Sequence, residues 1–115
     1  MEKRKAIVTG SSSGIGKAIT SILLKSGADV IGIARDHDKF EPNFACYLPI
    51  SLDLSDFEKI ESVIPQLLHQ HSDIDVLICN AGYGDFQALE NFSSQQISKF
   101  INLNLISHII LCRHL

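Results

Sequence analysis

Residues 5–17, KAIVTGSSSGIGK, join a short apolar segment to a glycine-rich turn and the start of a helix. The apolar run at 6–8 suits a strand buried on both faces of a parallel sheet. Gly10, Gly14 and Gly16 follow it in the pattern T-G-x-x-x-G-x-G. Glycine lets the chain turn sharply off the strand and lets backbone N–H groups come close to a phosphate. The stretch therefore predicts a strand, a turn that binds a pyrophosphate and a helix.

An ordinary Gly/Ser turn between a strand and a helix is the simpler interpretation of the same residues. The helix expected from about 14 to 26 would present unpaired N–H groups and the positive end of its dipole to an anion. Ser11, Ser12 and Ser13 would add hydroxyl donors. Because an apolar strand precedes the turn and an amphipathic helix follows it, we favour phosphate binding.

The length and composition predict one globular domain spanning residues 1–115. The chain is 45% hydrophobic and 20% charged, with a net charge of −3. This balance gives no electrostatic basis for binding nucleic acid, and no apolar stretch is long enough to cross a membrane. The basic start MEKRK leads into an apolar run too short for a signal peptide, so we expect a cytoplasmic protein.

The cysteines do not indicate a metal site or a disulfide framework. Cys46, Cys79 and Cys112 are odd in number and contain no C-x-x-C spacing. Each lies in an apolar run, which favours buried, reduced thiols.

Strands and helices are expected to alternate along the whole chain. After the first strand and helix we expect a strand at 28–34, a polar segment at 35–45, a strand at 46–50, a helix at 55–71, a strand at 74–79, a loop at 80–92 and a helix from Ser93 or Ser94 to 115. Right-handed crossovers then predict a doubly wound parallel sheet of about four strands in the order 3-2-1-4, with helices on both faces.

Two local features of the helix at 55–71 can be predicted. Ser55 is expected to cap it, with Glu58 as the partner in a capping box. Pro65 is expected to kink or split the helix near Ile64.

Polar or glycine residues follow each expected strand. These strand ends are Thr9-Gly10, Ala34-Arg35, Asp53-Leu54 and Asn80-Ala81-Gly82. Ligands of doubly wound sheets lie across the carboxyl ends of the strands. Four such ends in register predict a ligand site, although strands that simply end in polar turns would leave the same pattern.

Together these motifs resemble the amino-terminal half of a short-chain dehydrogenase/reductase. The resemblance rests on T9-G10-x-x-x-G14-I15-G16, D53-L54, N80-A81-G82 and N104 within I101-N-L-N-L-I106, and it covers the whole chain. The family's usual Asn-Asn-Ala-Gly motif has Cys79 in place of its first Asn here. The family resemblance implies a Rossmann-type fold and a nicotinamide dinucleotide cofactor.

The resemblance also implies a role for each site residue. It assigns the pyrophosphate turn and the nearby ribose to Gly10, Ser12, Ser13, Gly14, Ile15 and Gly16. Asp53 would accept a hydrogen bond from the adenine amino group, with Leu54 beside the ring. Asn80, Ala81 and Gly82 would lie along the ribose on the nicotinamide side, and Asn80 also has the structural role of tying neighbouring strands together.

The end of the second strand bears on the choice of cofactor. NAD sites place a carboxylate there, about 20 residues past the glycines. This chain has Ala34 followed by Arg35, which resembles the NADP-binding members, because a guanidinium pairs well with a 2′-phosphate. Asp36 keeps NAD as the alternative. We therefore expect NADP.

Asn104 aligns with the asparagine of the family's Asn-Ser-Tyr-Lys catalytic set. In the family its backbone carbonyl, at a helix irregularity, holds a water of a proton relay; a polar residue on a helix surface is the alternative. A tyrosine with an ordinary pKa near 10 needs the lysine of Tyr-x-x-x-Lys to act as a base. Tyr47 and Tyr83 have no lysine at that spacing.

We therefore expect a truncated domain that binds NADP(H) but lacks the catalytic serine, tyrosine and lysine. The alternatives are a catalytically silent nucleotide-binding or interaction module, and a non-functional remnant. A small-molecule substrate is expected only in a complete protein. The apolar edge at 74–79 or the C-terminal helix would mediate homo-oligomerisation.

Overall fold

The chain folds into a parallel sheet with helices on both of its faces. In this computed structural model, residues 3–12, 14–37, 46–82 and 89–115 are described. The elements are β1 (Lys5–Thr9), α1 (Gly14–Lys25), β2 (Asp29–Ala34), β3 (Tyr47–Ser51), α2 (Phe57–Gln70), β4 (Val76–Ile78), the 3₁₀ turn η1 (Leu89–Asn91), α3 (Ser94–Ile101), the π-helical segment η2 (Asn102–Ile106) and α4 (Ser107–His114).

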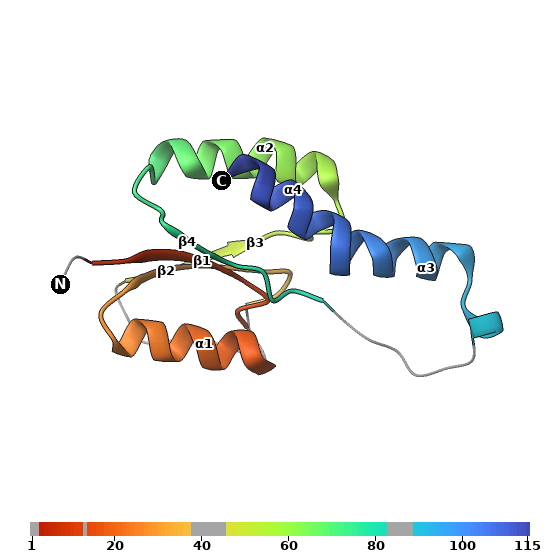
Figure 1. The fold of residues 1–115 in the computed structure, drawn as a ribbon, viewed down its shortest axis with the longest axis horizontal. Helices are drawn as coiled ribbons and strands as arrows, with labels where there is room; N and C mark the ends of the chain where they lie inside the picture. The colour runs from red at the N-terminus through yellow and green to blue at the C-terminus, as the bar shows by residue number, and fades with distance from the viewer. Residues whose placement is uncertain (1–2, 13, 38–45, 83–88) are drawn as a thin grey trace.

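Strand β1 is central, paired in parallel with β2 on one side and β4 on the other. Among the described residues the sheet has four strands in the order β3-β2-β1-β4. Helix α1 covers one face, and α2 and α4 cover the other (Figure 1). The predicted order 3-2-1-4 and the doubly wound arrangement are confirmed.

The apolar side chains of the central strands form the core. Ile7 and Ile33 are fully buried and pack with Ile60, Ile64 and Leu111 from α2 and α4. A second cluster lies on the α1 face and contains Val8, Leu24 and Val30. Because both faces of β1 are covered, its middle side chains, at 6–8, must be apolar.

Strand β4 is shorter than the predicted strand at 74–79. At its amino end, the N–H of Ile74 donates to the carbonyl of His71 in a turn. Beyond Ile78, the N–H groups of Asn80 and Ala81 donate to the side chain of Thr9 rather than to a neighbouring strand. Because these N–H groups bond outside the sheet, the hydrogen-bonded pairing of β4 with β1 ends early.

The predicted cap of α2 is wrong, and the split that was one of two alternatives at Pro65 is absent from this helix. Asp56, not Ser55, caps the helix, and its carboxylate accepts the N–H of Lys59. The hydroxyl of Ser55 donates instead to Asp53 at 2.7 Å. Pro65 does not split the helix, which is continuous from Phe57 to Gln70. The proline is exposed, so the carbonyl that loses its partner there can be hydrated.

The expected C-terminal helix begins as predicted but changes form midway. Ser93 caps α3 in a reciprocal capping box with Gln96. The π-helical segment Asn102–Ile106 then separates α3 from α4, and the N–H of Ser107 donates to the carbonyl of Asn102. The predicted irregularity around Asn104 is therefore present.

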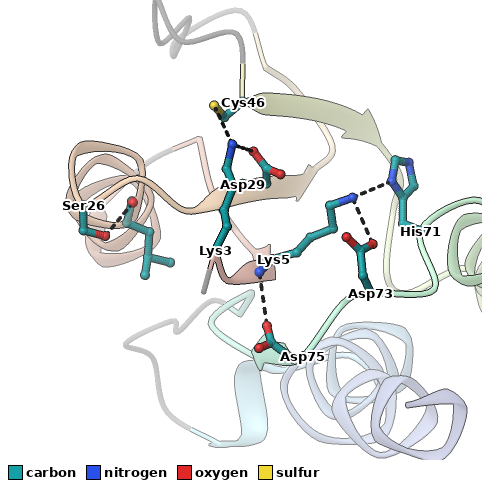
Figure 2. Close-up of polar contacts among 9 residues, drawn as sticks. Lys3, Lys5, Ser26, Asp29, Cys46, His71, Asp73 and Asp75 are labelled. Carbon is teal, nitrogen blue, oxygen red and sulfur yellow. Dashed lines mark hydrogen bonds and ion pairs between the residues drawn. The ribbon is translucent and has the colours of Figure 1, made fainter. Parts of the chain in front are cut away.

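Ion pairs cross the amino ends of the strands, opposite the predicted site. They are Lys3–Asp29 at 3.1 Å, Arg4–Asp75 at 2.7 Å and Lys5–Asp73 at 3.1 Å. Figure 2 shows Lys3 pointing to Asp29 and Lys5 pointing to Asp73 and His71. Consecutive basic residues thus reach the segments on both sides of β1 and help to fix its register.

These pairs predict an acid-sensitive contribution to stability. Hydrogen bonding to Arg4 lowers the pKa of Asp75 below its usual value of 3.8. A carboxyl whose pKa is lower in the folded state than in the unfolded state stabilises the fold fully when the pH is above the unfolded-state pKa. This stabilisation is lost as the pH falls through the folded-state pKa. We expect Asp75→Asn to lower the thermal midpoint slightly at pH 7 and to match the parent chain near pH 2.

The control for this experiment is Glu58→Gln, on the first turn of α2, followed by circular dichroism at both pH values. An Asp75→Asn deficit of the same size at both pH values would contradict the ionic explanation.

Candidate functional site

A pocket opens at the carboxyl edge of the sheet, where the predicted site residues meet. It has a volume of about 130 Å³. Its lining comprises Gly10, Ile33, Ala34, Arg35, Leu52, Leu54, Ala81, Gly82 and Leu103. The ends of all four strands therefore contribute to one hollow, as the sequence predicted for these strand ends.

The turn after β1 has the geometry that its glycines predict. Gly10 has φ +69°, in the left-handed region that favours glycine, and its N–H donates to the carbonyl of Ile33 at 2.7 Å. A Cβ on Gly16 would collide with the carbonyl oxygen of Gly10, so α1 packs directly against the turn. Apart from its chain neighbours and its own helix backbone, no atom of the described residues lies within 4 Å of a Cβ added at Gly14, so this side of the turn is open.

The serines of the turn do not share one role. Ser11 is fully buried, and its hydroxyl lies 3.0 Å from that of Tyr47, so the prediction that it offers a donor to phosphate is wrong. Ser12 is half-buried next to the exposed start of α1, where Gly14 and Ile15 are exposed. Ser13 lies outside the described residues.

Thr9 ties the end of β1 to the end of β4. Its hydroxyl oxygen accepts the N–H groups of Asn80 and Ala81, both at 2.9 Å, and donates to the carbonyl of Ile78 at 3.5 Å. The Asn80 amide donates to the carbonyl of Gly10 at 3.3 Å. Asn80 therefore has the strand-tying role that was its structural alternative, directly before Ala81, which lines the pocket.

The π-helical segment lies against the Asn-Ala-Gly turn. A Cβ on Gly82 would collide with Oδ1 of Asn104, whose Nδ2 donates to the carbonyl of Phe100 at 2.9 Å. His108, which we did not predict, lies with Nε2 at 2.8 Å from the carbonyl of Ala81. π-Helical segments are frequent at functional sites. Asn102 instead lines a separate hollow with Ser55.

Opposing effects act on the Asp53 carboxylate. Burial by itself would raise the pKa of Asp53, but hydrogen bonds from Ser55 and the charges of Arg35 and Lys99 lower it. The side chain is therefore an anion at neutral pH. One of its oxygens, Oδ1, accepts both the N–H and the hydroxyl of Ser55, at 2.9 and 2.7 Å.

Lys99 is a site residue that we did not predict. It lines a hollow of about 230 Å³ together with Arg35, Asp53 and Leu103. Neither Lys99 nor Arg35 forms an ion pair with any residue in the described part of the chain. The four-residue spacing of Lys99 in α3 and Leu103 in η2, which is typical of one side of a continuous helix, is the signal that could have found it.

Replacing Thr9 tests the tie between β1 and β4. Thr9→Val keeps the shape but leaves two N–H groups without their acceptor, and we expect the free energy of unfolding to fall by about 2–4 kcal/mol. Thr9→Ser keeps the hydroxyl, and its loss of one methyl should cost about 1 kcal/mol. Urea denaturation of both variants measures the difference. Equal losses would mean that the hydroxyl contributes nothing.

Comparison with known proteins reveals one family. The family model described as short chain dehydrogenase matches residues 4–115. The 3-oxoacyl-(acyl-carrier-protein) reductase of Haemophilus influenzae is 34% identical over 112 residues, which cover 93% of this chain and 46% of the reductase.

Solved structures agree with this family match. A short-chain dehydrogenase from Streptomyces avermitilis superposes with a TM-score of 0.89 at 31% identity, covering 99% of this chain and 43% of that one. A 4-hydroxyisoleucine dehydrogenase complexed with NADH superposes with a TM-score of 0.85 at 27% identity, covering 96% and 47%. The chain thus spans less than half the length of these relatives.

Proposed function

The chain belongs to the short-chain dehydrogenase family, and we propose that it supplies the part of an oxidoreductase that binds a nicotinamide dinucleotide. The observation that carries this proposal is the convergence of the strand ends on one pocket, next to a turn that is open at Gly14. The solved dehydrogenase with bound NADH supports the same class of ligand.

In this proposal each strand end binds one part of the cofactor. The pyrophosphate would lie on the turn formed by Gly10, Ser12, Ser13, Gly14, Ile15 and Gly16, at the amino end of α1. Asp53, which is ionised and hydrogen-bonded to Ser55, would accept a hydrogen bond from the adenine amino group, with Leu54 beside the ring. Asn80, Ala81 and Gly82 would line the ribose next to the nicotinamide.

We propose NADP as the preferred form of the cofactor. Arg35 and Lys99 line the hollow next to Asp53, and neither is neutralised by an ion pair within the described residues. Two cations without an ion pair there would favour a ligand that carries an additional phosphate. NAD remains the alternative because Asp36 follows Arg35.

Hydride transfer is proposed for a whole protein that contains this segment. Asn104 would act there through its backbone carbonyl, in the π-helical segment where helical pairing is irregular. The sequence contains no Tyr-x-x-x-Lys, so for residues 1–115 by themselves we propose cofactor binding alone. A silent nucleotide-binding module is the second candidate, and no helix among the described residues could span a membrane. A cytoplasmic location stays a prediction.

Arg35→Ala tests the proposed cofactor. Loss of a charged hydrogen bond to the 2′-phosphate should weaken NADPH binding about tenfold or more, whereas NADH, which lacks that phosphate, should bind almost as before. Fluorescence titration of the purified chain with each nucleotide measures both dissociation constants.

Lys25→Ala, which removes an exposed cation from the last turn of α1, is the matched control and should change neither constant. If the parent chain bound neither nucleotide at millimolar concentration, the proposed function would be wrong. If Arg35→Ala weakened the binding of NADPH and NADH equally, the proposal of cofactor binding would stand, but the proposed preference for NADP would be wrong.

We also propose that the chain self-associates through its C-terminal helices or the edge strand β4. Ile97, Ile101, Leu105 and Ile109 recur at every fourth position along α3, η2 and α4, and all are exposed. Strand β4 is at the edge of the sheet and is only half-buried. An apolar row on a helix surface and an apolar edge strand both favour association.

Leu105→Lys tests the helical surface. Leu105 is 53% exposed, and a charge there should oppose burial against a second copy. We expect light scattering after gel filtration to give an oligomer for the parent chain and a smaller species for the variant. Ile22→Lys, at a 67% exposed position on α1, is the control that should leave the oligomer unchanged. A monomeric parent chain would contradict the proposal.

A further inference from the structure

A chain of hydrogen bonds joins the turn after β1 to the residues that follow β2. The Oγ of Ser11 lies 3.0 Å from the hydroxyl of Tyr47, which lies 3.5 Å from Nδ1 of His37. The other ring nitrogen of His37, Nε2, lies 2.8 Å from the carbonyl oxygen of Ile50. The rings of His37 and Tyr47 also meet edge to face, with their centroids 6.4 Å apart.

The carbonyl at one end sets the direction of this chain. The Ile50 oxygen can only accept, so Nε2 of His37 carries a hydrogen. In the neutral ring Nδ1 is then an acceptor, and it takes the hydroxyl hydrogen of Tyr47. The hydroxyl of Ser11 donates in turn to Tyr47. Each side chain therefore provides a hydrogen-bond donor for the next one. Replacing the middle residue, Tyr47, removes the hydrogen bonds to both Ser11 and His37.

The surroundings of the Tyr47 hydroxyl leave it little freedom. Ser11 is fully buried, and a Cβ on Gly32 would collide with both the Tyr47 hydroxyl and the Ser11 Oγ. Burial raises the pKa of Tyr47, although the hydrogen bond from Ser11 acts in the other direction. The phenol is thus protonated at neutral pH and is packed into a space that exists because β2 has glycine at that position.

His37 holds one end of the short segment that carries Arg35. At the other end of this segment, the carbonyl of Ala34 accepts the N–H of Leu52 at 3.0 Å. His37 is thus hydrogen-bonded to the backbone of β3, and Ala34 to the backbone of Leu52, just after β3. Only Arg35 and Asp36 lie between these two anchored residues. Arg35 lines the pocket shared with Gly10 and the hollow shared with Asp53.

We propose that Tyr47 and His37 are positioning residues that set the preference for NADPH over NADH. They hold the segment carrying Arg35 against β3 and, through Ser11, in register with the turn that binds the pyrophosphate. The two phosphate-binding parts of the site are thereby kept at a constant separation. This inference rests on the proposed NADP-binding function and adds the residues that orient its charged contact.

Tyr47→Phe and His37→Ala test the proposal by the ratio of two affinities. Each should lower the ratio of NADPH to NADH affinity about fivefold, because only NADPH uses the positioned guanidinium. His37→Gln can still donate to the Ile50 carbonyl and should recover part of the ratio. Fluorescence titrations with NADPH and NADH give the ratio, and titrations with 2′,5′-ADP and 5′-AMP repeat the comparison without the nicotinamide.

A purely structural role would give a different result. It would lower the thermal midpoint and weaken the binding of NADPH and NADH equally, which leaves their ratio unchanged. An unchanged ratio would overturn the proposal. Ser11→Ala, which leaves both rings in place, provides a second, milder interruption and should shift the ratio in the same direction. His69→Ala, on the exposed side of α2, is the histidine control. If the parent chain bound no nucleotide, the proposed function itself would fail; binding with an unaltered ratio would reject only the positioning role.

Discussion

The structure depends on the pairing of β1 with a strand on each side. Lys5–Thr9 is hydrogen-bonded to β2 and β4, and helices cover both faces of the sheet. The middle of this strand, at 6–8, is buried, so its side chains have to be apolar and its backbone paired. The same pairing brings the residues after β1, β2 and β4 to one edge, and the pocket at that edge follows from it.

The two ends of β1 are held by different kinds of interaction. At the amino end, exposed ion pairs join consecutive basic residues to aspartates on both sides. Such pairs are screened by solvent and salt, and they contribute more to register than to stability. At the carboxyl end, the single buried hydroxyl of Thr9 accepts two N–H groups. The end next to the pocket is thus held by a buried hydroxyl, which solvent weakens less than it weakens exposed ion pairs.

Most of the fold could be predicted from the sequence because its signals are local. Apolar runs of strand length alternate with amphipathic helices, and chirality leaves few ways to connect them. The errors also have local causes. Ser55 resembled a helix cap, but its hydroxyl and N–H are both bound to Asp53, and Asp56 takes its place. Pro65 resembled a helix break, but its exposed position lets solvent take over the lost pairing.

The sequence by itself determined the strand order, the glycine turn and the residues at each strand end, because these depend on spacing along the chain. Only the tertiary structure showed that Lys99 shares a hollow with Arg35, that His108 binds Ala81 and that Ser11 faces Tyr47 rather than a ligand. Each of these contacts joins residues that are far apart in the sequence. The relative positions and orientations of the segments that carry them are set by core packing. A periodic pattern predicts which face of an element is buried, but which side chain it meets there depends on how the elements pack.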